Sequence, residues 1–428
     1  MYFTFAADAF SWIFLALITF MWITVGIFAT KYAEHIDHKK RFFLFYILTY
    51  LMLVLLCFSA SYLTMYLSFE FMTLLSMPLV LHDETKEAIA AAKKYLYYSI
   101  FGATLAILGL VFANRYAADT FVAGGSLVSG LSESQTLVLQ IAIFLSIVGF
   151  GAKAGLFPLH SWLPTAHPVA PAPASAVLSG VITKAGVLCI IRVIYFVFGT
   201  EIIRGTWVQY ALISLALLTI FLGSLMAYQQ TLIKKRFAYS SVSQVSYVLF
   251  GVFTMNPIAL TGAMLHVIYH SVIKDCLFLV SGAVIFTNHK HGIAELEGIG
   301  RKMPITFACF TVASLGLVGV PPFAGFLSKW YLATGSLAEG IPVLSWLGPA
   351  VLLASALLTA AYLLSISIKA YFPSREGGKT PADYCVDDKE APNRMLFSMI
   401  LLAVLVVILG VVAQPWVNLF IDVVGGLF

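Results

Sequence analysis

Long apolar runs are the feature that most limits how this chain can fold. A helix of roughly 20 apolar residues crosses the hydrocarbon core of a bilayer, and the sequence contains many such runs, with 61% hydrophobic and only 11% charged residues. Soluble domains have about 45–50% apolar and about 25% charged residues. The short alternating strands of a membrane β-barrel are not found in the sequence. It therefore predicts an all-α polytopic membrane protein.

The apolar runs predict about twelve transmembrane helices in a single transmembrane domain, residues 1–428. The expected spans lie near residues 9–29, 42–60, 61–81, 95–115, 136–157, 172–197, 206–228, 238–254, 257–285, 304–328, 344–370 and 395–424. The second and third spans run together, so we expect a tight turn near Ser59–Ser61. The longest polar stretch, Pro373–Asn393, is expected to be a cytoplasmic loop.

The distribution of lysine and arginine supports this number of spans. When successive loops are assigned to alternate sides, one side receives only Arg115 and Arg204, whereas the other collects eighteen basic residues: Lys31, Lys39, Lys40, Arg41, Lys86, Lys93, Lys94, Lys234, Lys235, Arg236, Lys290, Arg301, Lys302, Lys369, Arg375, Lys379, Lys389 and Arg394. Cytoplasmic loops are enriched in these residues. Both termini are therefore expected outside the cytoplasm, in a bacterial or archaeal cytoplasmic membrane.

Composition also argues against several classes of site. The five cysteines are scattered without a C-x-x-C pair, which disfavours zinc and iron–sulfur sites. The net charge of +5 comes mainly from loops, so nucleic acid is not an expected partner. His35 and His38 in "EHIDHKK" could bind a metal, but a solvated loop explains them better. The first apolar run is long and lacks a basic leader, so we expect no cleavable signal peptide.

Two segments combine glycines, prolines and one lysine inside an apolar run. "GFGAKAGLFPLHSWLP" contains Lys153, followed by its prolines, and "GLVGVPPFAGFLSKWY" contains Lys329, preceded by its prolines. Paired interrupted helices in two halves of a chain indicate the ion site of a transporter. Two unrelated proline kinks are the simpler alternative. A lysine in hydrocarbon costs roughly 2.5–3.5 kcal/mol, so its presence in both segments favours a functional pair.

Few other ionisable residues remain within the spans. Glu70 and Lys184 lie near the middle of theirs, where neither can easily reach the membrane surface. Such residues usually face a bundle interior and mark ion pathways. Arg192 lies nearer the outer end, and we expect its side chain to extend to the interface. Asp275 is expected to pair with a neighbouring cation and is not included in the predicted pathway.

"HVIYHSVIK" places His266, His270 and Lys274 at positions i, i+4 and i+8. These positions form one stripe roughly 12 Å long on a helix. Two imidazoles and an amine suit a proton relay, because histidine titrates near neutral pH. Core histidines that bond to hydroxyls, or a metal site formed by His266 and His270, are less favoured alternatives.

The longest motifs resemble the antiporter-like proton-pumping membrane subunits of complex I (NADH-quinone oxidoreductase) and its relatives. These relatives include multisubunit Na⁺/H⁺ antiporters and energy-converting membrane-bound hydrogenases. The matching motifs are "GAKAGLFPLHSWLPTAHPVAPAPASAVLSGVITKAGVLCIIR", "QQTLIKKRFAYSSVSQVSY", "HVIYHSVIKDCLFLVSG" and "GVPPFAGFLSKW". The resemblance implies two inverted five-helix repeats, each with one discontinuous helix. It places a first repeat core at 61–197 and a second at 206–370, with flanking helices in 9–60 and 395–424.

The resemblance also implies roles for individual residues. Glu70 is similar to the family's paired glutamate, Lys153 to the lysine of the first discontinuous helix, and Lys184 to the central lysine. The histidine stripe with Lys274 corresponds to the second-half relay, and Lys329 to the terminal site. A Glu70–Lys153 pair at about 4 Å would be worth roughly 4 kcal/mol at an effective dielectric near 20. Movement of Glu70 would then drive a proton from Lys153 towards Lys184.

Two departures from the family pattern concern length. Family members usually have about fourteen helices, whereas this chain resembles one that starts at the third, "ADAFSWIF". It also ends at its twelfth helix, without the long lateral helix of the distal complex I subunit.

The expected function is proton translocation in a redox-driven membrane complex. No flavin, haem, quinone or iron–sulfur motif is identified, so cofactors are expected only in partner membrane subunits. The alternative is a subunit of a Na⁺/H⁺ antiporter. A membrane-embedded transferase using His160, His266 or His270 would not explain the buried lysines, and a structural subunit without transport would not explain the buried charges.

Overall fold

The computed structural model describes residues 3–373 and 387–428, and the regular elements in these ranges are helices joined by turns and loops. Much of the predicted loop Pro373–Asn393, including Arg375 and Lys379, lies outside the described residues. The α-helices are α1 (Ala9–Tyr32), α2 (Lys39–Cys57), α3 (Tyr62–Val80), α4 (Lys86–Tyr116), α5 (Glu133–Ala154), α6 (Leu163–Val169), α7 (Ala172–Val177), α8 (Thr183–Arg192), α9 (Trp207–Gln229), α10 (Ile233–Thr254), α11 (Pro257–Asn288), α12 (Pro304–Val318), α13 (Gly325–Glu339), α14 (Leu344–Tyr371), α15 (Asn393–Val411) and α16 (Gln414–Gly425). Two π-helical turns, η1 (Leu178–Ile182) and η2 (Val193–Phe198), flank α8.

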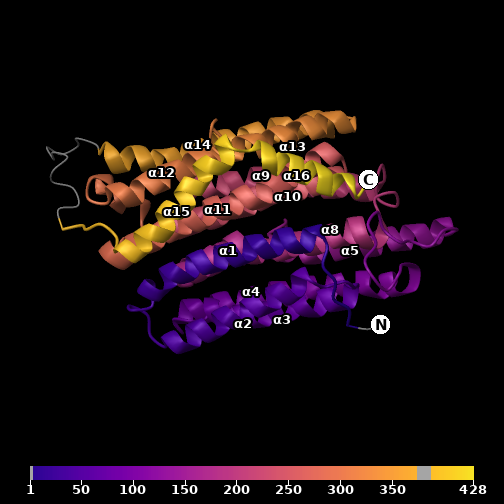
Figure 1. Cartoon of the computed structure of the whole chain (residues 1–428), viewed down its shortest axis with the longest axis horizontal. Coiled ribbons are helices and arrows are strands. Elements are labelled where there is room, and N and C mark those ends of the chain that lie inside the picture. The colour runs from indigo at the N-terminus through magenta and orange to yellow at the C-terminus, as the bar shows by residue number, and fades with distance from the viewer. Residues whose placement is uncertain (1–2, 374–386) are drawn as a thin grey trace.

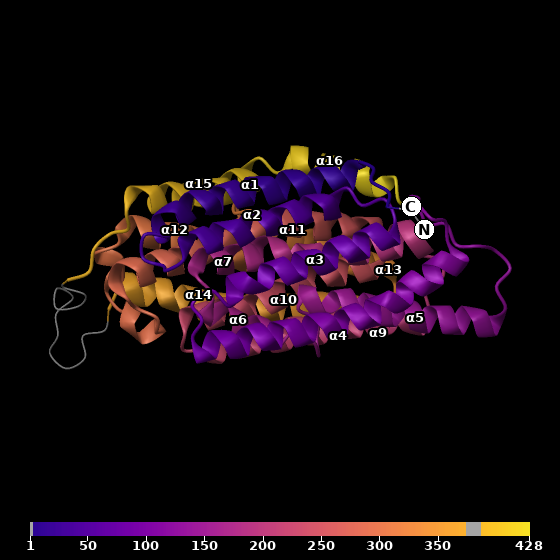
Figure 2. The same ribbon diagram turned by 90° about the horizontal axis from the view of Figure 1, so that it is seen from below.

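The helices run nearly parallel along the longest axis of the molecule (Figures 1 and 2). Helices α2–α5 lie on one side of the bundle and α12–α14 on the other, with α8, α10 and α11 between them. Both termini lie at the same end. Within the described residues, ten helices are long and apolar enough to cross a membrane, including the continuous segment Ala172–Phe198. The chain is therefore an integral membrane protein.

Each of the twelve predicted spans corresponds to helix in the structure, and the turn near Ser59–Ser61 is confirmed between α2 and α3. The last span, 395–424, was wrongly predicted as one helix. It consists of α15 and α16, because Pro415 lacks the backbone N–H that would continue α15 and instead occupies the first turn of α16. The span 304–328 likewise divides into α12 and the start of α13.

The two predicted discontinuous helices are present and end in the same way. Helix α5 stops at Ala154 and α12 at Val318, and each is followed by a glycine with positive φ, Gly155 at 86° and Gly319 at 88°. Glycine adopts this left-handed conformation without the steric cost that a Cβ would bring. The chain continues as α6 in the first case and α13 in the second.

Each discontinuous helix is the fourth segment in a run of five. The runs are α2, α3, α4, α5–α6 and α7–α8, then α9, α10, α11, α12–α13 and α14. The first run begins at the end that carries Lys39 and Arg41, whereas the second begins at the opposite end beside Arg204, so their directions are inverted. This architecture agrees with the predicted fold class. The boundaries 61–197 and 206–370 stay a prediction, since the first excludes α2.

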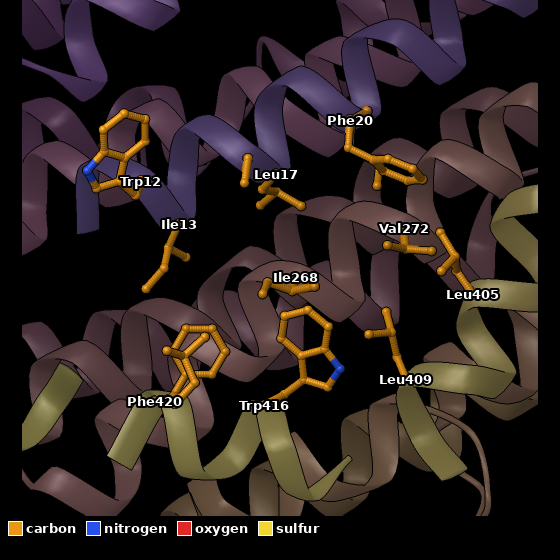
Figure 3. Close-up of a pocket in the computed structure, with 13 residues that line it drawn as sticks. Trp12, Ile13, Leu17, Phe20, Ile268, Val272, Leu405, Leu409, Trp416 and Phe420 are labelled. Atoms are coloured by element: carbon orange, nitrogen blue, oxygen red, sulfur yellow. The ribbon is translucent and has the colours of Figure 1, made fainter. Parts of the chain in front are cut away.

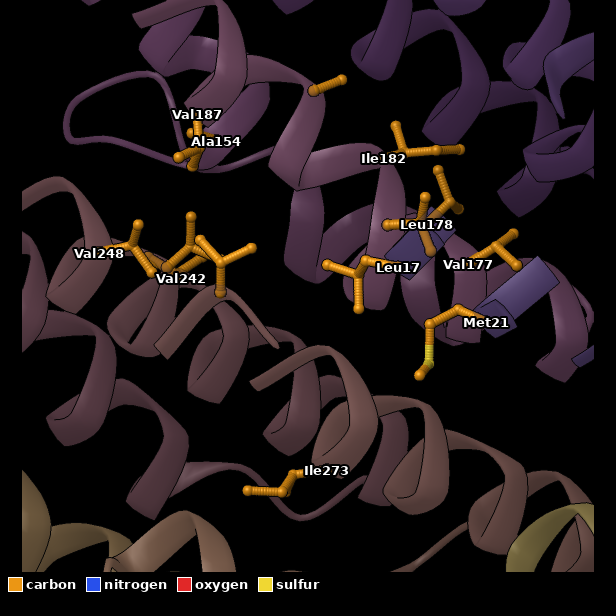
Figure 4. Packing of buried hydrophobic residues seen from close by; sticks show 14 of the residues in the cluster. Leu17, Met21, Ala154, Val177, Leu178, Ile182, Val187, Val242, Val248 and Ile273 are labelled. Carbon is orange, nitrogen blue, oxygen red and sulfur yellow. The ribbon is translucent and has the colours of Figure 1, made fainter. Parts of the chain in front are cut away.

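The apolar core extends across both halves. Side chains from α1, α5, α10 and α11 pack around the buried segment Ala172–Phe198, which comprises α7, η1, α8 and η2 (Figure 4). Helices that are apolar on all sides are buried in this way. A separate cavity of about 440 Å³ lies between α1, α11, α15 and α16 and is lined only by apolar side chains, among them Trp12, Ile268 and Trp416 (Figure 3).

The guanidinium of Arg192 is buried against the start of α1 instead of being exposed to solvent. Its side chain is only 3% exposed and forms an ion pair with Asp8, the residue that caps α1. The guanidinium also donates to Ser11 Oγ at 3.1 Å and lies over the ring of Phe196 at 4.4 Å. A partner on α1 therefore replaces the interfacial water that we expected. Burial raises the pKa of Asp8, but the Arg192 contacts outweigh it and lower the pKa overall.

Asp8→Asn tests this ion pair. Asparagine caps helices about as well as aspartate, so the substitution mainly removes the charge opposite Arg192. Asp8 is 40% exposed, so the pair is only half-buried, and we expect its loss to cost about 1.5–3 kcal/mol, the range for hydrogen bonds to charged groups, and to lower the melting temperature of the purified protein. Asp422→Asn, which changes an exposed carboxylate on α16, is the control. Equal melting temperatures for the two variants would contradict the assignment.

Because Asp8 has a lowered pKa in the folded protein, its stabilising contribution is present above its unfolded-state pKa. That contribution is lost as the pH falls through the folded-state pKa. The stability difference between wild type and Asp8→Asn should therefore shrink on acidification, as measured by melting temperatures across a pH series.

Candidate functional site

Lys153 lies in the last turn of α5, directly before the break, and its side chain is buried. Its Nζ donates hydrogen bonds to Tyr95 Oη at 2.8 Å and Ser99 Oγ at 3.1 Å, both from α4. The amine also lies 4.2 Å from the centre of the Tyr95 ring and 5.6 Å from that of Trp162. Hydroxyl acceptors and aromatic faces both stabilise an ammonium group, which explains how this helix accommodates the lysine.

The expected Glu70–Lys153 contact at about 4 Å is not formed. No ion pair joins them within 4.0 Å among the described residues, and Glu70 Oε1 is buried without a hydrogen-bond partner. Phe69 lies next to Glu70 in α3, and its ring centre is 5.8 Å from Lys153 Nζ. The Tyr95 and Ser99 hydroxyls thus take the place expected for the carboxylate. The predicted contact at about 4 Å is therefore replaced by α4 partners that the sequence did not reveal, but Glu70 and Lys153 still act on each other electrostatically.

Lys184 connects the two halves of the chain. Its fully buried side chain projects from α8, and its Nζ lies 2.6 Å from His270 Nδ1 on α11. The same amine donates to Ser179 O at 2.7 Å, within the π-helical turn η1. The proton between Lys184 and His270 can reside on either nitrogen, depending on the imidazole tautomer. This is a direct contact between two titratable groups from different repeats.

The predicted histidine stripe is present on α11 and buried. The rings of His266 and His270 are stacked with centroids 6.0 Å apart, and the Nε2 atoms of both have no hydrogen-bond partner among the described residues. His266 Nδ1 lies 2.9 Å from Ser328 Oγ on α13. The ring of Tyr247 stacks on His266 from the other side, at 5.4 Å. The stripe therefore extends from Lys184 to the second discontinuous helix.

Lys329 follows Ser328 and is partly buried beside the break between α12 and α13. Its Nζ donates to Leu317 O at 2.7 Å and Val318 O at 2.8 Å. These are C-terminal carbonyls of α12, which carry partial negative charge. The amine also lies 5.3 Å from the Tyr247 ring centre. The second break thus supplies acceptors for its lysine.

Lys274 is buried on α11, but its amine does not contact His270. It donates to Phe237 O of α10 at 3.1 Å.

Two further titratable groups lie near this part of the bundle, and sequence analysis missed both. Lys234 was assigned to a loop, yet it is only 7% exposed and donates to Ala170 O at 2.7 Å. His167 is fully buried, and neither of its ring nitrogens bonds to another residue in the described part of the chain.

The other residues that sequence analysis missed are hydroxyls. Tyr95 and Ser99 lie at i and i+4 in "KKYLYYSIFG", so a polar stripe on α4 was a signal that could have identified them. No comparable sequence pattern identified Ser328, which directly precedes Lys329. Asp275 was left out of the pathway, but it is fully buried and forms no ion pair within 4.0 Å in the part of the chain that the structure describes.

The structure therefore brings Lys184, His270, His266 and Lys329 into one series of neighbouring groups through Ser328 and Tyr247. Glu70 and Lys153 lie in the first repeat, and Lys274 makes a separate contact with Phe237 O. Amines, imidazoles and hydroxyls of this kind can each accept and release a proton. The arrangement suits the movement of protons across the membrane interior.

Comparison with known proteins identifies the family. Residues 59–367 match the NADH:quinone oxidoreductase/Mrp antiporter transmembrane family. The chain belongs to this family. NADH-quinone oxidoreductase subunit N of Desulforudis audaxviator is 31% identical over 406 residues, which cover 92% of this chain and 79% of the relative. A Na⁺/H⁺ antiporter subunit of Bacillus subtilis is 26% identical over 423 residues, 97% of this chain and 82% of the relative.

A solved structure shows the same fold for this antiporter-like chain. The Mrp complex from Dietzia sp. DQ12-45-1b contains a chain that matches with a TM-score of 0.85 at 20% sequence identity, covering 99% of this chain and 84% of that chain. The predicted resemblance is thereby confirmed. Members of this family are antiporter-like membrane subunits of multisubunit complexes, and this chain is one of them.

Lys153 donates to hydroxyls on α4 and does not directly contact Glu70. Comparing a variant of Tyr95 with a variant of Glu70 therefore shows which group stabilises the amine more. Tyr95→Phe removes a hydroxyl that accepts from its amine, and bonds to charged groups are worth about 1.5–3 kcal/mol. Glu70→Gln removes a carboxylate that makes no direct contact with the amine. We expect Tyr95→Phe to lower the unfolding free energy of the purified protein more than Glu70→Gln does. The reverse order would show that the carboxylate is the main partner.

Proposed function

We propose that this chain is the proton-translocating subunit of a redox-driven membrane complex. Protons would move through Glu70, Lys153, Lys184, His266, His270, Lys274 and Lys329. The observation that carries the proposal is the 2.6 Å contact between Lys184 Nζ and His270 Nδ1. A transport pathway that uses both repeats needs a point at which protons pass from one to the other, and this contact supplies it.

Electrostatic coupling would drive the transfer. Two like charges 4 Å apart repel by roughly 4 kcal/mol at an effective dielectric near 20, so protonation of Lys153 and Lys184 in turn disfavours a proton on the next group. A change in the position of Glu70 would alter the charge near Lys153 and release its proton towards Lys184. The imidazole of His270 then passes the proton along the stacked pair to Ser328 and Lys329. The groups titrate as one coupled system.

The orientation of the chain in the membrane is inferred from the distribution of its basic residues. The end of the bundle rich in lysine and arginine faces the cytoplasm by the positive-inside rule, and both termini lie outside. The membrane is a bacterial or archaeal cytoplasmic membrane. Electron transfer takes place in partner subunits, which would hold flavin or iron–sulfur clusters, and this chain holds no cofactor.

Exchange of Na⁺ for H⁺ is the second candidate, favoured by the similarity to the Na⁺/H⁺ antiporter subunit of B. subtilis. Hard cations prefer oxygen ligands, whereas the pathway consists mainly of amines and imidazoles. These groups carry protons well and bind alkali cations poorly. The side-chain chemistry therefore favours the proton. Replacing Na⁺ with choline would leave transport unchanged in the first case and abolish it in the second.

Lys153→Ala in the assembled complex tests the proposal. Proton uptake into inverted native membrane vesicles, driven by the complex's own electron donor, should fall by about tenfold or more, which corresponds to roughly 1.4 kcal/mol or more in a barrier. Lys93→Ala, an exposed lysine on α4, is the matched control and should pump normally. Unchanged uptake in a fully assembled Lys153→Ala complex would reject the role of this pathway.

A further inference from the structure

Asp275 carries a buried carboxyl group that accepts no hydrogen bond from any residue in the described ranges. It lies on α11 directly after Lys274, its side chain is fully buried, and neither Oδ1 nor Oδ2 has a partner. A carboxylate buried without a compensating partner is strongly unfavourable. Such a group persists in a membrane bundle where it exchanges a proton with a neighbour or binds an ion.

The carboxyl group lies against Gly180 in the π-helical turn η1. A Cβ built on Gly180 would lie 1.9 Å from Asp275 Oδ1, so only glycine leaves room for this approach. Ser271, one turn before Asp275 on α11, donates its hydroxyl to Gly180 O at 2.6 Å. This bond fixes the position of α11 against η1. π-Helical turns within α-helices are frequent at functional sites.

Lys184 lies on the same face, one turn after Gly180. Its amine already donates to Ser179 O, the carbonyl next to Gly180, at the same time as it contacts His270. Lys184 acts electrostatically on Asp275, and also on Lys274 and His270. The lysine thus contacts the imidazole of His270 directly, while the Asp275 carboxyl lies against Gly180, the residue next to its Ser179 acceptor.

We propose that Asp275 is a protonatable second partner of Lys184, and that Lys184 alternates between the carboxyl of Asp275 and the imidazole of His270. This inference rests on the proposed function. It adds a carboxyl to the crossing point between the two repeats, a role that the residues of the predicted pathway do not include.

The transfer conserves the number of protons. With the amine neutral, the proton of the Asp275 carboxylic acid moves to Lys184 Nζ and leaves a carboxylate and an ammonium, so the pair has no net charge before or after. A second proton arriving from Lys153 reprotonates the carboxylate. The Lys184 ammonium then turns to His270, gives its proton to Nδ1 and returns as the neutral amine. The pair thus passes one proton per cycle while it limits the net charge in the bundle centre.

Few titratable groups surround Asp275. Lys184 acts on it electrostatically from α8, and it interacts with the phenol of Tyr46 from α2. On its own helix the neighbours are Lys274, Cys276 and His270. Tyr46 donates its hydroxyl to Trp22 O at 2.8 Å and is thereby held away from the exchange.

Infrared spectra of the purified complex test the protonation directly. The spectrum of wild type minus that of Asp275→Asn should contain a carboxylic acid C=O band at neutral pH, and this band should disappear as the pH is raised. In Lys184→Met, which lacks the amine, the band should persist to higher pH. Absence of the band at every pH at which the complex pumps would overturn the inference. If Asp275→Asn does not assemble, the pH dependence of the band in wild type and Lys184→Met decides alone.

Transport provides the second readout. In Asp275→Asn the Lys184 ammonium lacks its carboxylate, so proton uptake should fall and its half-maximal pH should move down by about one unit or more. Asp422→Asn, on the exposed face of α16, should behave as wild type. A wild-type rate and pH profile in Asp275→Asn would overturn this inference and leave the proposed function standing. Normal pumping by Lys153→Ala would instead remove the proposed function itself.

Discussion

The need to stabilise amines in a low-dielectric interior governs this structure. Each lysine of the proposed pathway has a polar acceptor: hydroxyls for Lys153, a carbonyl and an imidazole for Lys184, and backbone carbonyls for Lys274 and Lys329. For two of these lysines, the acceptor is a carbonyl in an irregular part of the backbone. The break after α12 exposes the carbonyls that hold Lys329, and the π-helical turn η1 positions Ser179 O for Lys184. Such irregular backbone occurs at membrane depth only where it is buried in protein or faces water.

The need to stabilise buried amines also determines where the two repeats contact each other. The segment Ala172–Phe198 is buried along its whole length, and its first part, α7 and η1, packs against α11, which carries the histidine stripe. Lys184 joins the halves through His270, and Gly180 admits Asp275 at the adjacent turn. A charge that arrives at this point therefore acts on groups of both repeats at once. A small displacement of η1 against α11 would change several of these interactions together, which suits a chain that responds to events in its neighbours.

Much of the fold could be predicted from the sequence, because span length and hydrophobicity depend on local composition. The spans, the two breaks and the histidine stripe followed from apolar runs and helical spacing. The contacts did not, because they join residues far apart in the chain. Arg192 was expected at the interface, but Asp8, 184 positions away, neutralises it inside. Glu70 was expected at Lys153, but hydroxyls on α4 occupy that place. Only packing decides between such partners.

Sequence analysis also gave too small a role to single polar residues. Lys234 was counted among loop charges and Asp275 was set aside, yet both are buried. A position within one turn of a helix end, or next to another charge, does not reveal which way a side chain projects. The roles proposed for Lys184 and Lys329 came from the family resemblance, because the spacing of residues alone does not indicate them.

The central claim is that the repeats act in series through Lys184 and His270, and a double-mutant cycle on proton uptake tests it most directly. Lys184→Met, His270→Leu and the double variant would be compared in assembled complexes in inverted membrane vesicles. Series transfer predicts that either single change already abolishes most of the uptake and that the double variant is no worse than the more severe single one. Residual rates that fall multiplicatively, as for two independent sites, would contradict the account.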